Sequence, residues 1–237
     1  MIIVDDGEWQ RVITQPDHAR FAGDLLSLWR TRGLPDHPRR GDLIFATREH
    51  DNGWQEADAA PWIDPETSRP FDFISYPERD RREIWKKGIF RFAEQRPLVA
   101  LLIAEHAESI HQPLSGEWRG FFKDLEPHRC SWFEEAEVNQ STVRQDYRFL
   151  ELADSLSLAL CTQTEKSLLQ NGVEATVMGD LLALEPCPLV GTTSFQIPIR
   201  RIESRPYETD TAIGSALARA RWERWWVKVG PKPRVDA

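Results

Sequence analysis

The chain has 237 residues, of which 41% are hydrophobic and 29% charged, and its net charge is −8 at neutral pH. This composition is typical of a globular protein with a sizeable core, and the acidic balance argues against a nucleic-acid partner bound through a basic face. No apolar run approaches the roughly 18 residues of a membrane span, and the first residues lack a secretory pattern. We therefore expect no membrane partner and a cytoplasmic location.

The first residues predict a short hairpin and then a helix. Residues 2–4 and 9–13 have strand character around Asp5-Asp6-Gly7. Thr14 is a good N-cap for a helix that runs to about residue 29, with Pro16 in its first turn.

Apolar periodicity predicts further helices at about residues 42–51, 81–95, 97–111 and 134–161. Two aromatic-rich segments are expected to be irregular, 52–82 as part of a cleft wall and 113–135 as a connection.

The composition changes after residue 163, where segments 173–184 and 192–202 predict strands. Another helix is expected at 210–221 and a last strand at 225–229. The predicted fold is therefore mainly α, a single domain over residues 1–237. It would have a helical core at about 14–165 and a smaller β-rich cap at about 172–230.

Three cysteines, Cys130, Cys161 and Cys187, are widely spaced, which fits a reducing compartment and gives no metal-finger pattern. Cys161 falls on a helix that is apolar nearly all round, so we expect an inert core thiol.

The doublet His50-Asp51 stands at the end of the predicted 42–51 helix, just before Asn52-Gly53, a helix stop signal. Leu43, Ala46 and His50 share helical spacing, which places the imidazole on the buried stripe. One metal at the helix end could take both side chains, and the two oxygens of Asp51 could bridge two ions.

Polar side chains also interrupt the apolar faces of three other predicted helices. They are His18, His106 and Asp154. Each has an ordinary structural explanation as a hydrogen-bonded core residue, and a helix C-terminus can stabilise His50 through the dipole. Burying a carboxylate or imidazole without a partner is costly, however, so the simplest explanation for the whole set is that the side chains meet. Such a donor set suits one or two ions of Mn, Fe, Co, Ni or Zn.

The order His18, His50-Asp51, His106, Asp154 resembles the HD-domain superfamily of metal-dependent phosphohydrolases, which are all-helical proteins with ligands on separate core helices. The wider sequence resembles an uncharacterised bacterial family of unknown function. The resemblance rests on residues 14–19, 49–54, 101–106 and 154–158. It implies an HD-like helical core.

By that resemblance, His18, His50, Asp51 and Asp154 would be the four ligands of one metal, and Asp51 would bridge to a second. His106 would hold that second ion or contact phosphate, so Asp51 and His106 are the catalytic candidates. The family pattern has a second histidine before the last Asp, for which His111 and His128 are the candidates here. It also has a cation beside the doublet, where this chain offers Arg20 or Arg48.

The resulting hypothesis is a metal-dependent, HD-like hydrolase that acts on a small phosphorylated molecule or nucleotide through metal-activated water. Two alternatives remain open. A di-iron site would favour an HD-like oxygenase, and a cluster that holds no metal would favour a non-catalytic ligand-binding domain.

Overall fold

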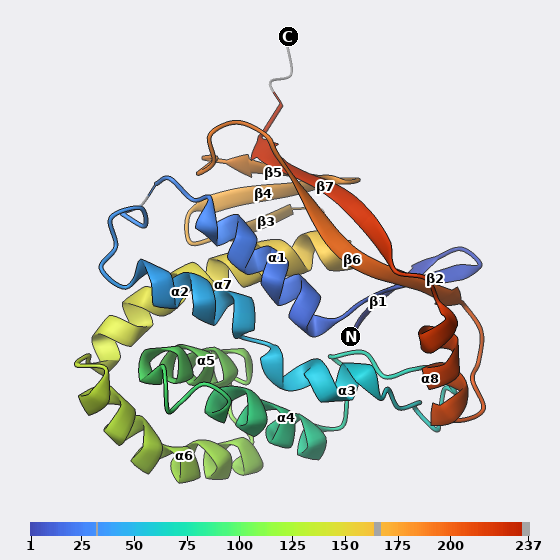
Figure 1. Ribbon diagram of the computed structural model, residues 1–237, viewed down its shortest axis with the longest axis horizontal. Helices are drawn as coiled ribbons and strands as arrows, with labels where there is room; N and C mark the ends of the chain where they lie inside the picture. The colour runs from blue at the N-terminus through green and yellow to red at the C-terminus, as the bar shows by residue number, and fades with distance from the viewer. Residues whose placement is uncertain (32, 164–166, 234–237) are drawn as a thin grey trace.

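A computed structural model describes residues 1–31, 33–163 and 167–233 of the chain. Within these residues the protein is about 48% helical and has one curled, seven-stranded mixed sheet. The strand order is β1-β2-β6-β7-β5-β4-β3, and every neighbouring pair is antiparallel except β5 and β7. The sheet forms one layer, and most of the helices lie on its concave side (Figure 1).

Both ends of the chain build this sheet. The predicted N-terminal hairpin is present as β1 (Ile2–Asp6) and β2 (Trp9–Ile13). The outer edge of β2 pairs with β6 (Thr193–Glu203), where Val12 is opposite Arg200. The remaining strands are β3 (Ser167–Gln170), β4 (Val173–Met178), β5 (Leu181–Glu185) and β7 (Glu223–Pro231).

This topology shows that the predicted fold class was wrong. The fold is not a mainly α, HD-like core with a small C-terminal β-rich part, because helices and strands are interleaved and the hairpin completes the sheet. The reason is physical: β2 would expose an unpaired edge in a helical core, and pairing with β6 satisfies its backbone groups.

The helices follow in an unbroken series after the hairpin, except for the last one, which lies between β6 and β7 in the chain. Their bounds are α1 (Gln15–Ser27), α2 (Arg40–Glu49), η1 (Asn52–Trp54), α3 (Gln55–Ala59), α4 (Glu78–Phe90), α5 (Pro97–Ile110), α6 (Gly116–Glu135), α7 (Gln140–Thr162) and α8 (Asp210–Arg219). Two segments predicted to be irregular therefore contain helices. Segment 113–135 is almost entirely α6, capped by Ser115, and segment 52–82 contains η1, α3 and the start of α4.

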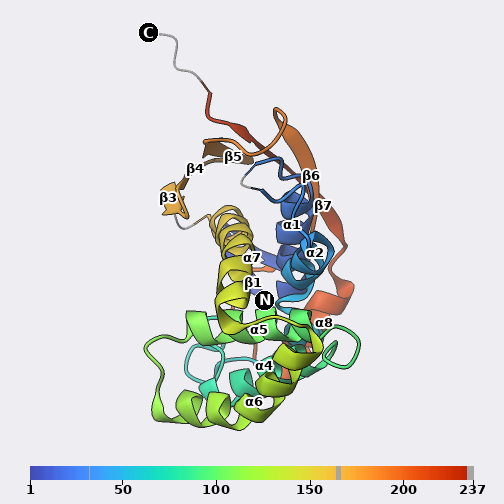
Figure 2. The same ribbon diagram turned by 90° about the vertical axis from the view of Figure 1, so that its left-hand side faces the viewer.

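Helices α1 and α7 connect the sheet to the rest of the helical layer. The curled sheet wraps around them, and α4, α5 and α6 lie beyond them (Figure 2). Thr14 caps α1 as predicted, because its side chain accepts a hydrogen bond from the Asp17 amide. The ring of Phe21 on α1 packs edge-on against Phe195 of β6, with ring centroids 5.3 Å apart. These contacts fix one face of α1 on the sheet.

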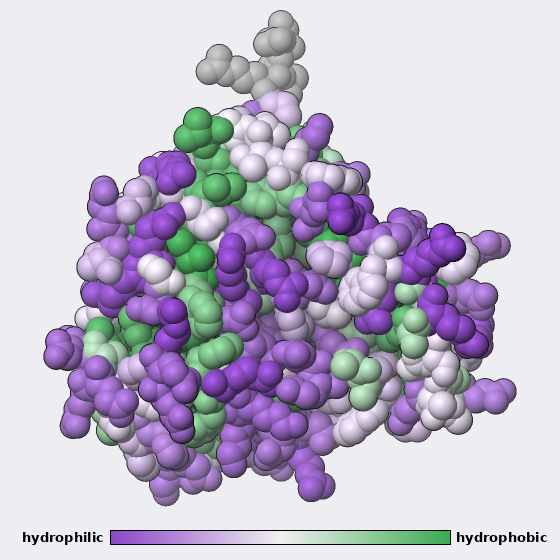
Figure 3. All heavy atoms as spheres, in the orientation of Figure 1, coloured by the Kyte–Doolittle hydropathy of each residue, from purple (hydrophilic) through white to green (hydrophobic). Residues whose placement is uncertain are grey.

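Among the described residues, no helix combines the length and apolar character that a membrane crossing requires. On the face drawn in Figure 3, hydrophobic atoms form scattered groups that hydrophilic side chains interrupt.

Candidate metal centre

The five predicted site residues meet between four helices. His18 comes from α1, His50 and Asp51 from the end of α2, His106 from α5 and Asp154 from α7. All five side chains are buried. Their convergence depends on helix periodicity, since each residue lies on the face of its helix that packs against the others.

A hydrogen-bond chain fixes the orientation of His18. Its Nδ1 lies 3.1 Å from Oγ of Ser157, and that hydroxyl donates to the backbone oxygen of His18 over 2.9 Å. Nδ1 must therefore donate to Ser157, which leaves the lone pair of Nε2 in a neutral ring directed at Oδ2 of Asp51, 2.8 Å away. Two acceptors at that separation repel unless a proton or a cation lies between them.

His50 is held in the same manner and has a free nitrogen. Its Nδ1 donates to the backbone oxygen of Thr47 over 2.8 Å. Its Nε2 lies 3.2 Å from Oδ1 of Asp154 and 3.5 Å from Oδ2 of Asp51. Neither Nε2 of His50 nor Oδ1 of Asp154 has a hydrogen-bond partner among the described residues, although both atoms are buried.

His106 closes the cluster on the side of α5. Its Nδ1 lies 3.2 Å from the hydroxyl of Tyr147, and its Nε2 lies 3.9 Å from Oδ2 of Asp154. Its ring meets the His50 ring edge-on, with centroids 4.8 Å apart. Thr47, Ser157 and Tyr147 thus each hold one imidazole, as partners of metal-ligating histidines usually do.

The donor atoms form two groups with the spacing of metal ligands. One is His18, His50 and Asp51, the other is His50, His106 and Asp154, and within each group the atoms lie within 4.8 Å of one another. Bonds of about 2.1 Å to one ion place neighbouring ligand atoms roughly 3–3.5 Å apart. The 3.2 Å and 3.5 Å contacts of His50 match that spacing, so the residues present fit a transition metal.

Electrostatics also favour a cation in the cluster. Burial alone would raise the carboxyl pKa values of Asp51 and Asp154, but the neighbouring imidazoles lower both below their usual range. Burial alone would lower the pKa of His50, but the two carboxylates raise it to about 9. Burial lowers the pKa of His106 to about 4, so that ring is neutral at pH 7. Two buried carboxylates therefore need positive charge, which a proton or a metal ion can supply.

A cavity of about 260 Å³ reaches the cluster from the surface. Three cluster residues, Asp51, His106 and Asp154, line its inner part. The other lining residues are Gln15, Trp54, Phe73, Ile74, Arg81, Trp85, Ile110, His111 and Leu158. Segment 52–82 contributes part of this wall, as the sequence predicted.

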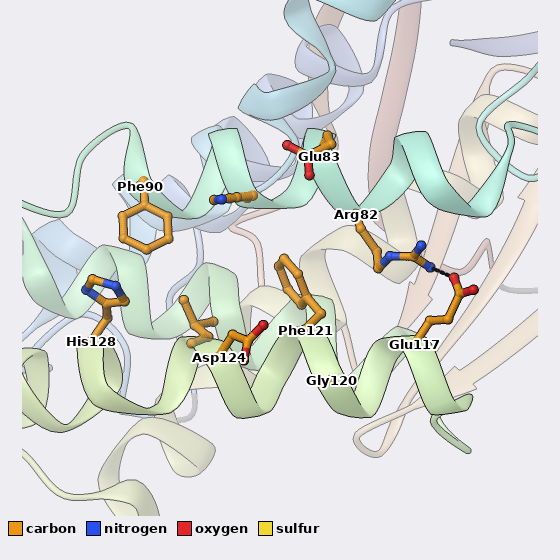
Figure 4. Close-up of a pocket in the computed structure, with 10 residues that line it drawn as sticks. Arg82, Glu83, Phe90, Glu117, Gly120, Phe121, Asp124 and His128 are labelled. Atoms are coloured by element: carbon orange, nitrogen blue, oxygen red, sulfur yellow. Dashed lines mark ion pairs between the residues drawn. The ribbon is translucent and has the colours of Figure 1, made fainter.

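A larger cavity of about 450 Å³ lies elsewhere, between α4 and α6. Figure 4 shows the Phe121 ring projecting between these helices and Arg82 paired with Glu117. None of the five cluster residues lines this cavity. Of these two cavities, the smaller one is therefore where a bound molecule would contact the candidate metal ligands.

The remaining sequence candidates divide between the two cavities and the surface. His111 lines the smaller cavity, whereas His128 lines the larger one and stacks on Trp132. Arg20 pairs with Asp17, and Arg48 pairs with Asp24, so neither arginine joins the cluster. Both are surface arginines, so neither supplies the cation that the family pattern places beside the doublet.

The sequence did not identify Thr47, Ser157 and Tyr147 as the residues that hold the imidazoles. It also did not identify Arg81, which lines the smaller cavity. Ser157 shared the predicted seam of Asp154, and Thr47 stands one helical turn before His50. Periodicity places these residues on the right face, but it does not say which ring each would bind.

The fold and the site define a mixed helix-and-sheet protein with a buried cluster of three histidines and two aspartates. Residues 1–199 match the family described as "Protein of unknown function (DUF3891)", and the chain belongs to that family. Comparison with curated proteins and with solved structures gave no match.

Proposed function

We propose that this protein is a metal-dependent hydrolase acting on a small phosphorylated molecule. One observation carries the proposal: Nε2 of His50 and Oδ1 of Asp154 are buried, 3.2 Å apart and without hydrogen-bond partners among the described residues. Leaving such atoms unpaired is costly, and either a proton or a shared metal ion between them would satisfy both; we propose the metal ion.

His18, His50, Asp51 and Asp154 would hold one ion, because each has a donor atom within 3.9 Å of another member of the set. His106 and the second oxygen of Asp51 would serve a second ion or the phosphoryl group. A transition metal such as Mn, Fe, Co, Ni or Zn supplies Lewis acidity toward water and phosphoryl oxygens.

The chain's own residues would orient the substrate and exclude water. Ser157, Thr47 and Tyr147 keep the three imidazoles aimed at the cluster. The neutral ring of His106 directs Nε2 toward Asp154 at the inner end of the cavity. The indole of Trp85, with a ring centroid 5.6 Å from that of His106, keeps this end apolar and strengthens electrostatic contacts there.

We further propose a cytoplasmic location, which is supported by three free cysteines, Cys130, Cys161 and Cys187.

The test is metal content per chain, measured by elemental analysis on protein purified without added metal or chelator, followed by a screen of phosphate esters. Wild type and His128→Ala should carry the same stoichiometric metal, because His128 is exposed and outside the cluster. His50→Ala should lose that metal and any hydrolytic activity. A wild-type protein that neither carries nor takes up metal would contradict the proposal, and a redox-active iron pair would favour the oxygenase instead.

A further inference from the structure

The cavity that reaches the cluster contains one arginine with no assigned role. Arg81 lines this cavity, and its guanidinium makes no ion pair or hydrogen bond with any described residue. Its Nε is buried and unpartnered. The next residue behaves differently, since Arg82 points into the larger cavity and pairs with Glu78 and Glu117 (Figure 4).

Helix α4 carries Arg81 along the same wall as the cluster. Arg81 and Trp85 are four residues apart, so their side chains stand one above the other, about 5–6 Å apart at Cβ. Trp85 in turn contacts the rings of His106 and His111, with centroids 5.6 Å and 6.1 Å away. A phosphate group lying over Trp85 would therefore have the cluster on one side and the Arg81 guanidinium on the other.

The charges of the cavity leave Arg81 free for a ligand. Asp51 and Asp154 are the carboxylates in its lining, and they face the imidazoles of the cluster. His111 is held by the backbone oxygen of Ala107, and burial, together with the charge of Arg81, lowers its pKa. Arg81 is therefore the one fixed positive charge in the described lining, and a guanidinium is well suited to bind phosphate or carboxylate oxygens.

Size and composition restrict the ligand further. The cavity volume of about 260 Å³ lies below the roughly 300–1,000 Å³ of drug-sized sites. Its outer wall is apolar, with Ile74 and Ile110 exposed at the opening and Phe73 and Trp85 further in. The two carboxylates of the cluster would offset the charge of one divalent ion, so Arg81 leaves about one positive charge for the ligand, far less than a triphosphate carries.

We propose that Arg81 binds the anionic group of the substrate, and that the substrate is a small phosphate monoester with an apolar or single-ring body. This inference rests on the proposed hydrolase function. Arg81 acts here as a binding residue that contacts the phosphate from the side opposite the cluster, and the apolar body lies against Phe73, toward the opening. Charge and volume favour this class over polyphosphates and larger nucleotides.

The first test is calorimetric titration of inorganic phosphate into metal-loaded wild type, Arg81→Gln, Arg81→Lys and Arg79→Gln. Arg79 is the matched control, because it lies on the same helix, is exposed, and has no partner among the described residues. Arg81→Gln should weaken phosphate binding about 10- to 100-fold, the usual loss for a charge-assisted hydrogen bond. Arg81→Lys should recover part of it, and Arg79→Gln should match wild type.

The second measurement separates this inference from the proposed function. Metal content should be the same in all four proteins, because Arg81 is outside the ligand groups. Normal metal with unchanged phosphate affinity in Arg81→Gln would overturn the role of Arg81 and leave the hydrolase proposal intact. Absence of metal from wild type would overturn the hydrolase instead, and the same titrations without metal would then decide whether Arg81 binds phosphate.

Kinetics test the substrate class. Metal-loaded wild type should hydrolyse p-nitrophenyl phosphate, and Arg81→Gln should raise its KM more than it lowers kcat. Faster hydrolysis of adenosine triphosphate than of the monoester would overturn the size and charge restriction.

Discussion

Nε2 of His50 and Oδ1 of Asp154 face each other across 3.2 Å of buried space, and neither atom has a hydrogen-bond partner among the described residues. In most protein interiors such a pair would be bridged by a proton or would be surrounded by other donors. Here Nδ1 of His50 already donates to Thr47, so its orientation is fixed and Nε2 stays aimed at the carboxylate. From the proposed metal site we therefore predict that stability depends on metal.

We expect chelation to lower the thermal midpoint of wild type, because a ligand at 100 times its Kd adds about 2.7 kcal/mol of stability. Asp154→Asn keeps the side-chain volume but removes the charge, so its metal content should fall at least tenfold. Its midpoint should then not respond to chelator. Differential scanning calorimetry with and without chelator measures both proteins.

Asp124→Asn is the control for that experiment, since Asp124 is exposed beside the larger cavity. It should respond to chelator as wild type does. An equal response in Asp154→Asn would show that the metal is bound at another place.

Ser157 is expected to control metal affinity without touching the ion. Its hydroxyl lies between Nδ1 and the backbone oxygen of His18, so Ser157→Ala frees the imidazole to rotate. Loss of such a partner typically costs 10–100-fold in metal affinity. A competitive titration with a metal indicator should give that loss for Ser157→Ala and none for Ser155→Ala, which alters a half-buried serine on the same helix. Equal affinities in both variants would argue that His18 is not a ligand.

The close contact between η1, which follows the doublet, and α4 predicts a strong effect at Gly53. A Cβ on Gly53 would overlap the carbonyl oxygen of Ile84 and come within 3.0 Å of the Gly88 amide. Because both obstacles are backbone, α4 must shift, and we expect Gly53→Ala to cost about 1–3 kcal/mol of unfolding free energy. Urea denaturation measures this cost.

Gly120→Ala on α6 provides the contrast, because nothing lies within 4 Å of an added Cβ at that position. It should be neutral or stabilising by up to about 1 kcal/mol. Equal midpoints for the two variants would contradict the close approach of α4.

Local patterns predicted the helices that carry the cluster, because their apolar residues repeat with helical spacing. His18, His50, His106 and Asp154 were identified as polar interruptions of that repeat. The sheet could not be obtained in this way. The pairing of Val12 with Arg200 joins residues far apart in sequence, and no local signal specifies such a partner. This missing pair is why the predicted fold class was wrong.

The Trp- and Phe-rich segment was misassigned for another reason. Its aromatic side chains suggested an irregular connection, but Ser115 caps α6, and Trp132 of α6 packs on Phe90 of α4. Tertiary packing therefore outweighed weak local propensity. Arg81 escaped notice because its role depends on which cavity a residue of α4 faces, and the packing of α4 on α5 decides that.

Cys161 gives a prediction that depends on pH. Burial raises the pKa of its thiol to about 12, with the hydroxyl of Ser157 acting in the opposite direction. The thiolate is the reactive form, and its fraction grows as pH rises toward that pKa, so at pH 8 only about one Cys161 in 10⁴ is ionised. Iodoacetamide at pH 8 should therefore label exposed Cys130 in the native protein and leave Cys161 unmodified, as peptide mass spectrometry can measure. In denaturant both cysteines should react at similar rates, because burial no longer suppresses ionisation. Rapid native labelling of Cys161 would mean that α7 opens on the time scale of the reaction, and the cluster built on Asp154 would then be exposed to solvent as well.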